Sequence, residues 1–262
     1  MHKKIRNIKE VMKMIVVSGV LIEDLRRYGG YYICPKNSQG ERLGPLVGYA
    51  GKYEAPDGSK KAFVGDVYYN FAKMEVYPDI YGYYASNLAN KVSDFPERKC
   101  DIVLGAPMGG IILASDMARF LNCRRIFAEK KVISAATNDK REESILVIDR
   151  HDINFGDRVI LAEDICNNFS TTEKLIELVE KNAGQITAIA CLLNRSGKRD
   201  YLHRGITVPV ISSLYLPTLQ YKQEDPKVVY DMEAGNVVWK PKNEWVRLEK
   251  AMNDAELNEA AN

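Results

Sequence analysis

The stretch RVILAEDICNNFSTTEKLIELVEKNAG, residues 158–184, places an apolar strand directly before a polar loop and an amphipathic helix. Val159 to Ala162 are apolar at four consecutive positions, which is typical of a strand buried on both faces. Glu163 and Asp164 follow at the point where this strand leaves its sheet. A buried strand that runs straight into a helix is the repeating unit of parallel α/β sheets.

The helix in this stretch carries its own start and stop signals. Ser170 and Glu173 have the spacing of a capping box, and Gly184 is placed to end the helix. The apolar residues at helical spacing are Leu175, Ile176, Leu178 and Val179. The pattern predicts a helix that buries one face against the strand before it.

Apolar runs of the same kind recur from residue 100 onward. They are CDIVLGA from Cys100, RRIFA from Arg124, SILVI from Ser144, RVILA from Arg158, ITAIACLL from Ile186 and VPVIS from Val208. Helical segments such as GGIILASDMARFL separate several of them. The alternation predicts an α/β fold, with a parallel twisted sheet flanked by helices.

The first hundred residues have a different texture. Residues 5–28 predict a helix with interruptions, and the Gly, Pro, Lys and Tyr clusters between residues 29 and 61 predict turns and a hairpin. A short strand is expected in FVGDVYYNFAK, followed by a helix from about Pro78. The charged segment after Pro217 ends in a helical pattern.

Bulk composition excludes several classes of protein. Hydrophobic residues make up 46% and charged residues 27% of the 262 positions, as in ordinary globular proteins. A net charge of +2 gives no electrostatic case for nucleic-acid binding, and no apolar run is long enough to span a membrane. Five scattered cysteines without a CxxC motif indicate reduced thiols in a cytoplasm, and three isolated histidines favour no metal cluster.

Ligands of open parallel sheets bind beyond the carboxyl ends of the strands, and three loops there carry suitable chemistry. GAPMGG, residues 105–110, offers glycines and a helix N-terminus to an anion, although a tight turn alone would also need glycine. Lys130 and Lys131 predict either a basic loop that closes over phosphates or a solvated turn.

The third loop is the one after Ala162. Glu163 and Asp164 can accept hydrogen bonds from a vicinal diol or hold the waters of Mg²⁺. The amides and hydroxyls of residues 167–171 lie at a helix N-terminus, where phosphate is favoured. A capped helix beside two solvated acids would explain the same residues.

The order of GAPMGGIILA, RIFAEKK and GDRVILAEDICNNFSTT resembles the type I phosphoribosyltransferases, most of all the orotate type. The resemblance implies transfer of ribose 5-phosphate from phosphoribosyl pyrophosphate to a ring nitrogen of a nucleobase, with Mg²⁺ as cofactor and a homodimer as the assembly. It also implies one domain over residues 1–262. Within it, residues 1–99 form a hood region with an insertion near 36–62, 100–216 form the core and 217–262 form an extension.

The resemblance assigns roles to individual residues. Catalytic roles in binding the ribose hydroxyls and pyrophosphate fall on Glu163, Asp164 and Lys130. Substrate-binding roles fall on the phosphate loop, the pyrophosphate loop, a second lysine and the base pocket, namely Asn167, Asn168, Phe169, Ser170, Thr171, Pro107, Met108, Gly109, Lys131, Tyr68, Tyr69 and Lys73. The metal is expected on the pyrophosphate and ribose oxygens rather than on a protein ligand set.

Two loops depart from the family pattern. The phosphate loop of the family is usually close to Thr-Thr-Gly-Gly-Ser, whereas residues 167–171 read Asn-Asn-Phe-Ser-Thr without glycine. Glycine permits a left-handed backbone there, so the side chain of Phe169 must turn away or fill the space of the phosphate. In the basic region Glu129 precedes Lys130 and no histidine follows closely, and Lys131, Lys140 and Arg141 would have to compensate.

Three functions therefore remain open at the level of sequence. The first is an orotate phosphoribosyltransferase of pyrimidine nucleotide synthesis. The second is transfer to another nucleobase, with Tyr68 and Tyr69 shaping a changed pocket. The third is a regulator without catalysis that binds phosphoribosyl pyrophosphate or a nucleotide, which the missing loop glycines favour.

Overall fold

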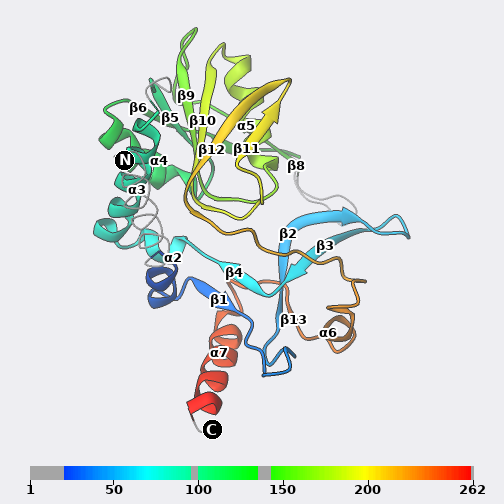
Figure 1. The fold of residues 1–262 in the computed structure, drawn as a ribbon. Helices are drawn as coiled ribbons and strands as arrows, with labels where there is room; N and C mark the ends of the chain where they lie inside the picture. The colour runs from blue at the N-terminus through cyan, green and yellow to red at the C-terminus, as the bar shows by residue number, and fades with distance from the viewer. Residues whose placement is uncertain (1–20, 96–99, 135–142, 261–262) are drawn as a thin grey trace, which may run out of the picture. The chain divides into compact units, whose positions relative to one another are not determined.

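The computed structural model describes residues 21–95, 100–134 and 143–260 (Figure 1). The chain forms two compact units. The first consists of Met1–Leu21 and Glu75–Pro217, and the second of Ile22–Met74 and Thr218–Asn262. The single domain expected from the sequence stays a prediction. Within the described residues, no helix is long and apolar enough to cross a membrane.

The first unit is built on a six-stranded sheet with the order β11-β12-β10-β9-β5-β6. The strands are β5 Ile102–Gly105, β6 Arg124–Phe127, β9 Arg158–Cys166, β10 Gln185–Asn194, β11 Asp200–His203 and β12 Ile206–Tyr215. All neighbouring pairs are parallel except β11, which adds to β12 as an antiparallel edge. Five of the six apolar runs in the sequence therefore form the parallel part of this sheet, as predicted.

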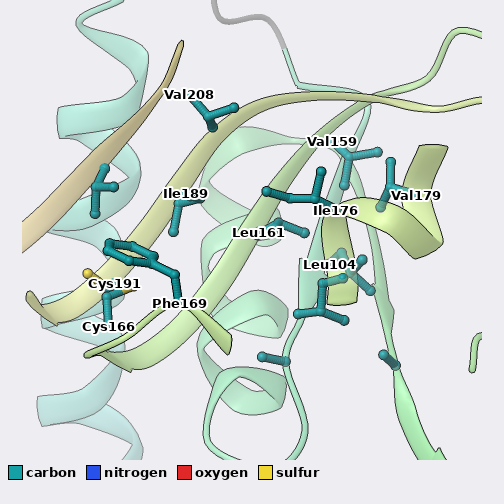
Figure 2. Packing of buried hydrophobic residues seen from close by; sticks show 14 of the residues in the cluster. Leu104, Val159, Leu161, Cys166, Phe169, Ile176, Val179, Ile189, Cys191 and Val208 are labelled. Atoms are coloured by element: carbon teal, nitrogen blue, oxygen red, sulfur yellow. The ribbon is translucent and has the colours of Figure 1, made fainter. Parts of the chain in front are cut away.

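Helices cover both faces of the sheet, which is why its strands are apolar at consecutive positions (Figure 1). Helix α5 (Ser170–Lys181) packs on one face, where it meets Leu104, Val159 and Leu161 (Figure 2). The other face contacts α3 (Pro78–Ser93) and α4 (Gly110–Leu121), which also contact each other. The glycine start of α4 and the proline in the first turn of α3 agree with the sequence pattern.

One predicted strand lies outside the sheet. The first four residues of SILVI lie in β8 (Glu143–Val147), which pairs antiparallel with β7 (Glu129–Ser134) in a separate two-stranded ribbon. The segment read as a basic loop or solvated turn is thus the strand β7, in which Lys130 lies opposite Leu146. A short apolar run does not reveal its partner, and Leu146 still packs against the core beneath α5.

The predicted capping box is also absent. Helix α5 has Phe169 as its N-cap, with no side-chain cap, and Ser170 is its first helical residue. The Ser170 amide instead donates a hydrogen bond to the side-chain oxygen of Asn168 at 3.2 Å. The helix keeps its predicted core face, because Leu175, Ile176 and Val179 are buried.

The second unit contains the hairpin expected between residues 29 and 61, although its second strand extends to Gly65. Strands β2 (Leu46–Glu54) and β3 (Lys60–Gly65) pair antiparallel, and β13 (Val237–Val238) adds in parallel to β2. Strands β1 (Tyr31–Ile33) and β4 (Val67–Tyr69) form a second small sheet. The helices are α6 (Val229–Glu233), α7 (Trp245–Ala260) and residues 21–27, while α2 (Ala72–Glu75) spans the boundary of the unit. The rest of the predicted first helix, residues 5–20, lies outside the described residues.

Candidate active site

The two acids after the VILA run point to opposite faces of the sheet. Both still belong to β9, and successive side chains of a strand alternate between its faces. Glu163 is in register with Cys191 of β10, which lies in the core cluster on the α5 face. Asp164 therefore points to the face that carries α4. The sequence treats these acids as a pair, but the strand gives them different surroundings.

The Glu163 side chain is partly buried at the end of β9. Its Oε2 atom is buried and has no hydrogen-bond partner within the described residues. Burial, and then the negative charge of Asp164, raise the pKa of Glu163 from 4.5 to about 8. Most Glu163 carboxyls therefore carry a proton at neutral pH. A buried carboxyl oxygen without a partner is costly, so it marks this position as a candidate for contact with a ligand.

We expect Glu163 to make the protein less stable as pH rises. Between pH 4.5 and about 8 the folded chain keeps a proton on Glu163 that the unfolded chain has released. Stability is then fully present below the unfolded pKa and is lost as pH rises through the folded one. Thermal unfolding measured from pH 5 to 8 should show this loss. Glu163→Gln should remove it, whereas the exposed control Glu177→Gln should keep it. An unchanged pH profile in Glu163→Gln would contradict the burial of the carboxyl.

Asp164 lies against the loop that joins β5 to α4. A Cβ atom on Gly109 would overlap the Asp164 carboxylate, and one on Gly110 would overlap the main-chain oxygen of Ala162. Ala106 donates its amide to the same Ala162 oxygen at 2.9 Å. The Asp164 carboxylate also accepts a hydrogen bond from the amide of Ile165 at 2.8 Å. Gly109 and Gly110 are thus required by the close approach of this loop to the end of β9.

A buried tyrosine that sequence reasoning assigned only to the core also touches this loop. The hydroxyl of Tyr81 in α3 lies 3.5 Å from the main-chain oxygen of Gly109. Its pKa is raised far above the ordinary value by burial and by the charges of Glu75, Asp164 and Asp116. Tyr81 therefore stays a neutral donor beside the loop. Its helical spacing gave no signal that would separate it from the other core residues of α3.

Gly109→Ala should lower the kcat of the transfer reaction that the sequence resemblance implies roughly 100-fold. Small displacements of a reacting group have effects of this size. The added methyl group must push Asp164 or the loop aside. Gly82→Ala is the matched control, since its Cβ would meet only Asp116 at 4.0 Å and it lies inside α3. The control should keep its turnover and gain up to ~1 kcal/mol in stability. Equal turnover in both variants would show that the Gly109 contact does not position the acid.

The loop after β9 takes a left-handed turn at Phe169, with φ 60° and ψ 12°. The side chain is buried in the cluster under α5, near Cys166 (Figure 2). Its ring lies 5.1 Å from that of Tyr201. The aromatic side chain has turned into the core, and Asn168 and Ser170 on either side are exposed. The backbone therefore adopts the conformation that glycine would favour, although no glycine is present.

Comparison with known proteins identifies a family that matches this chain. The family described as "Phosphoribosyl transferase domain" matches residues 79–208. The chain is 32% identical over 154 residues to the orotate phosphoribosyltransferase of Caldicellulosiruptor bescii, which covers 58% of this chain and 73% of that protein. It is 31% identical over 163 residues to that of Caldanaerobacter subterraneus subsp. tengcongensis, covering 62% and 76%.

This chain belongs to the phosphoribosyltransferase family. A solved structure similar to it is the orotate phosphoribosyltransferase of Aeropyrum pernix, with 18% identity and a TM-score of 0.49 over 75% of this chain and 93% of that one. The transferase class expected from the sequence is confirmed. The individual roles of Pro107, Met108 and the other site residues stay predictions.

The two predicted site lysines of this phosphoribosyltransferase, Lys130 and Lys131, lie in strand β7 of the β7–β8 ribbon. Lys130 is exposed, and Lys131 lies 3.4 Å from Asp149 with both side chains more than half exposed. Such an exposed pair contributes little to stability, so Lys131 can exchange this partner for an anion at low cost. Lys140 and Arg141 lie outside the described residues.

The residues expected to form the base pocket of the phosphoribosyltransferase lie in the second unit. Tyr68 and Tyr69 are neighbours in β4 and so point to opposite faces. Tyr68 packs with a small core cluster, while the Tyr69 hydroxyl lies 3.5 Å from that of Thr218. Lys73 is exposed in α2. At most one of the two tyrosines can therefore line a pocket on a given side of β4.

The structure adds one residue that the sequence analysis missed. Arg195 follows β10 and is only 6% exposed. Its amide donates to the main-chain oxygen of Cys166 at 2.9 Å, which places its backbone at the start of the 167–171 loop. Burying a guanidinium is costly, so such a residue at the carboxyl end of a strand is a candidate for binding an anion. The signal available in the sequence was a single basic residue directly after the apolar run ITAIACLL.

Proposed function

We propose that this chain transfers ribose 5-phosphate from phosphoribosyl pyrophosphate to orotate, giving orotidine 5-phosphate and pyrophosphate in pyrimidine nucleotide synthesis. The observation that carries the proposal is the position of Asp164 between the starts of two helices. One loop leads into α4 and lies against the Asp164 carboxylate, and the other leads from β9 into α5. Helix N-termini favour phosphate, and a carboxylate favours sugar hydroxyls. The substrate has a phosphate group on each side of a ribose.

The chemistry requires positioning and charge rather than a side-chain nucleophile. As pyrophosphate leaves, positive charge develops on the sugar, and Asp164 would lie close to it. Substrate oxygens would hold Mg²⁺, with the Asp164 carboxylate close by. When bound, Mg²⁺ supplies positive charge to the departing pyrophosphate.

Orotate is favoured over other bases by the relatives and by one residue. The two relatives described above carry the name orotate phosphoribosyltransferase. Orotate differs from uracil by a carboxylate, and a buried guanidinium is the side chain best suited to bind one. Arg195 lies at the edge of the proposed phosphate loop and is the residue we propose for this contact.

Arg195→Met should lower kcat/KM for orotate roughly 100-fold, as expected when one partner of a buried charge pair is removed. Binding of phosphoribosyl pyrophosphate alone, measured by calorimetry, should change little. The preference for orotate over uracil should shrink by the same factor as kcat/KM. An equal loss of affinity for phosphoribosyl pyrophosphate would instead place Arg195 at the phosphate or in the support of the loop.

The proposed function is tested by binding and turnover together. Phosphoribosyl pyrophosphate is titrated with Mg²⁺ by calorimetry, and orotate is then added while its absorbance is followed. Binding followed by loss of orotate supports the proposal. Binding without turnover calls for a panel of other nucleobases, and activity with one of them would replace orotate. Binding without turnover on any base would support the regulator, and no binding would refute a phosphoribosyl pyrophosphate site.

The structure weakens the main argument for a regulator without catalysis. That argument rested on the missing glycines of residues 167–171 and on the bulk of Phe169. The Phe169 side chain is buried in the core and its backbone is left-handed, so the loop has the conformation that glycine would provide. The homodimer and the cytoplasmic location stay predictions.

A further inference from the structure

Two cysteines meet at the end of the sheet opposite to the proposed active site. Cys100 precedes β5 and Cys123 precedes β6, and these strands are parallel neighbours with Ile102 opposite Arg124. The two sulfur atoms lie 3.4 Å apart. Because both residues enter adjacent strands at the same end, only a small movement separates this contact from the geometry of a disulfide bond.

The exposure of the five cysteines separates this pair from the others. Cys100 and Cys123 are partly exposed, whereas the remaining three are at most 3% exposed. The buried ones are Cys34, Cys166 and Cys191. Cys166 and Cys191 also contact each other, but they lie inside the core under α5 (Figure 2). Cys166 and Cys191 therefore serve as an internal control, because they are neighbouring thiols that solvent does not reach.

Cys123 opens onto a surface cavity that suits a small acidic molecule. The cavity has a volume of about 310 Å³ and is lined by Ser115, Ala118, Arg119, Asn122, Cys123 and Arg125. Arg125 donates to the Ser115 hydroxyl at 2.7 Å, and Arg119 lies 3.6 Å from Asp116. Arg119 and Arg125 thus line the same cavity as the thiol, and Arg119 is close to a carboxylate on its own helix.

The hydrogen bond between the two thiols shifts their pKa values in opposite directions. The hydrogen bond with Cys100 lowers the pKa of Cys123, against the opposing effects of burial and Asp101. The same hydrogen bond raises the pKa of Cys100. Cys123 lines the cavity and Cys100 does not, so a small disulfide reaches Cys123 first. Cys123 is therefore assigned as the nucleophile and Cys100 as the resolving thiol.

We propose that Cys123 is a site of reversible thiol modification by a small disulfide that carries carboxylates, and that Cys100 resolves the product. The Cys123 thiolate attacks one sulfur of the small disulfide, forms a mixed disulfide and releases one small thiolate. Cys100 then loses its proton and attacks the Cys123 sulfur, which releases the second small thiolate. Two protein thiols are oxidised to one disulfide, and the small disulfide is reduced to two thiols.

This modification is separate from the proposed transferase chemistry. Cys100 and Cys123 lie before β5 and β6, while the loops of the candidate active site follow the opposite ends of β5 and β9. We therefore expect the oxidised protein to keep its kcat within about twofold. A large loss of kcat on oxidation would show that the bond distorts β5 and would refute this separation.

The test uses the intact folded protein and glutathione disulfide as the probe, with mass spectrometry and peptide mapping without reductant. The wild type should lose two hydrogens and yield a peptide that joins Cys100 to Cys123. Cys100→Ser should carry one glutathione on Cys123, and Cys123→Ser should carry none. Peptide mapping of the wild type needs no variant, so it remains decisive if a variant folds poorly.

The cavity is tested with charge-matched probes. Replacing Arg119 and Arg125 by Gln should slow the reaction with glutathione disulfide several-fold and leave the reaction with neutral bis(2-hydroxyethyl) disulfide unchanged. Equal slowing with both probes would refute recognition of an acidic partner. A wild-type protein that stays fully reduced, or an adduct on Cys34, Cys166 or Cys191, would refute the site itself.

Discussion

Asp164→Asn should lower kcat of the transfer to orotate roughly 100- to 1,000-fold with little loss of stability, since single groups that stabilise developing charge have effects of this size. Asp164 lies against Gly109 at the junction of both proposed phosphate loops. Asparagine has nearly the same shape but no negative charge for the developing positive sugar. The loss should therefore appear in kcat more than in the KM for phosphoribosyl pyrophosphate.

The matched variant is Glu163→Gln, which should lose less than about tenfold. The pKa of Glu163 is raised to about 8, so most of its side chains are already neutral at pH 7. Glutamine then replaces a protonated acid by another neutral group of similar size. The comparison separates the two adjacent acids by charge, which the sequence motif Glu-Asp cannot do.

The test compares initial rates at pH 7 for the wild type and both variants. Thermal unfolding checks that each variant is folded. Equal and large losses in both variants would mean that Glu163 is ionised when substrate is bound. A nearly normal rate in Asp164→Asn would remove Asp164 from the reaction. Either outcome would require different roles for Glu163 and Asp164.

The parallel core could be predicted because its physical cause acts on consecutive residues. Strands such as β5 and β9 are covered by helices on both faces, and this leaves unbroken apolar runs at 102–105 and 159–162. The SILVI run is similarly apolar but pairs with β7 in a two-stranded ribbon apart from the six-stranded sheet. Hydrophobicity reports burial, not the identity of the neighbouring strand, so the ribbon could not be separated from the sheet.

The candidate site was predictable in position and not in detail. The rule that ligands lie beyond the carboxyl ends of parallel strands identified the segments 105–110 and 163–171. The division of Glu163 and Asp164 between two faces depends on how far β9 continues, to Cys166, which the apolar run does not show. Arg195 lacked a pattern of its own, because the burial of a single arginine follows from tertiary contacts.

The burial of the Phe169 side chain leads to the second large expected effect, which is an effect on stability. The side chain is 5% exposed and packs beside Cys166 and Tyr201. Phe169→Ala should lower the free energy of unfolding by about 3–5 kcal/mol, as for other buried phenylalanines. The exposed control Phe155→Ala, at a side chain that is 93% exposed, should change it by less than about 0.5 kcal/mol.

Phe169→Gly tests the backbone separately from the packing. It loses the same side chain as Phe169→Ala, but glycine adopts φ 60° without the cost of about 1–2 kcal/mol that other residues incur. Urea unfolding should therefore show the glycine variant to be about 1 kcal/mol more stable than the alanine variant. Its KM for phosphoribosyl pyrophosphate, measured well below its melting temperature, should stay within a few-fold of the wild type. If glycine and alanine were equally destabilising, the left-handed turn would not be what the loop requires at this position.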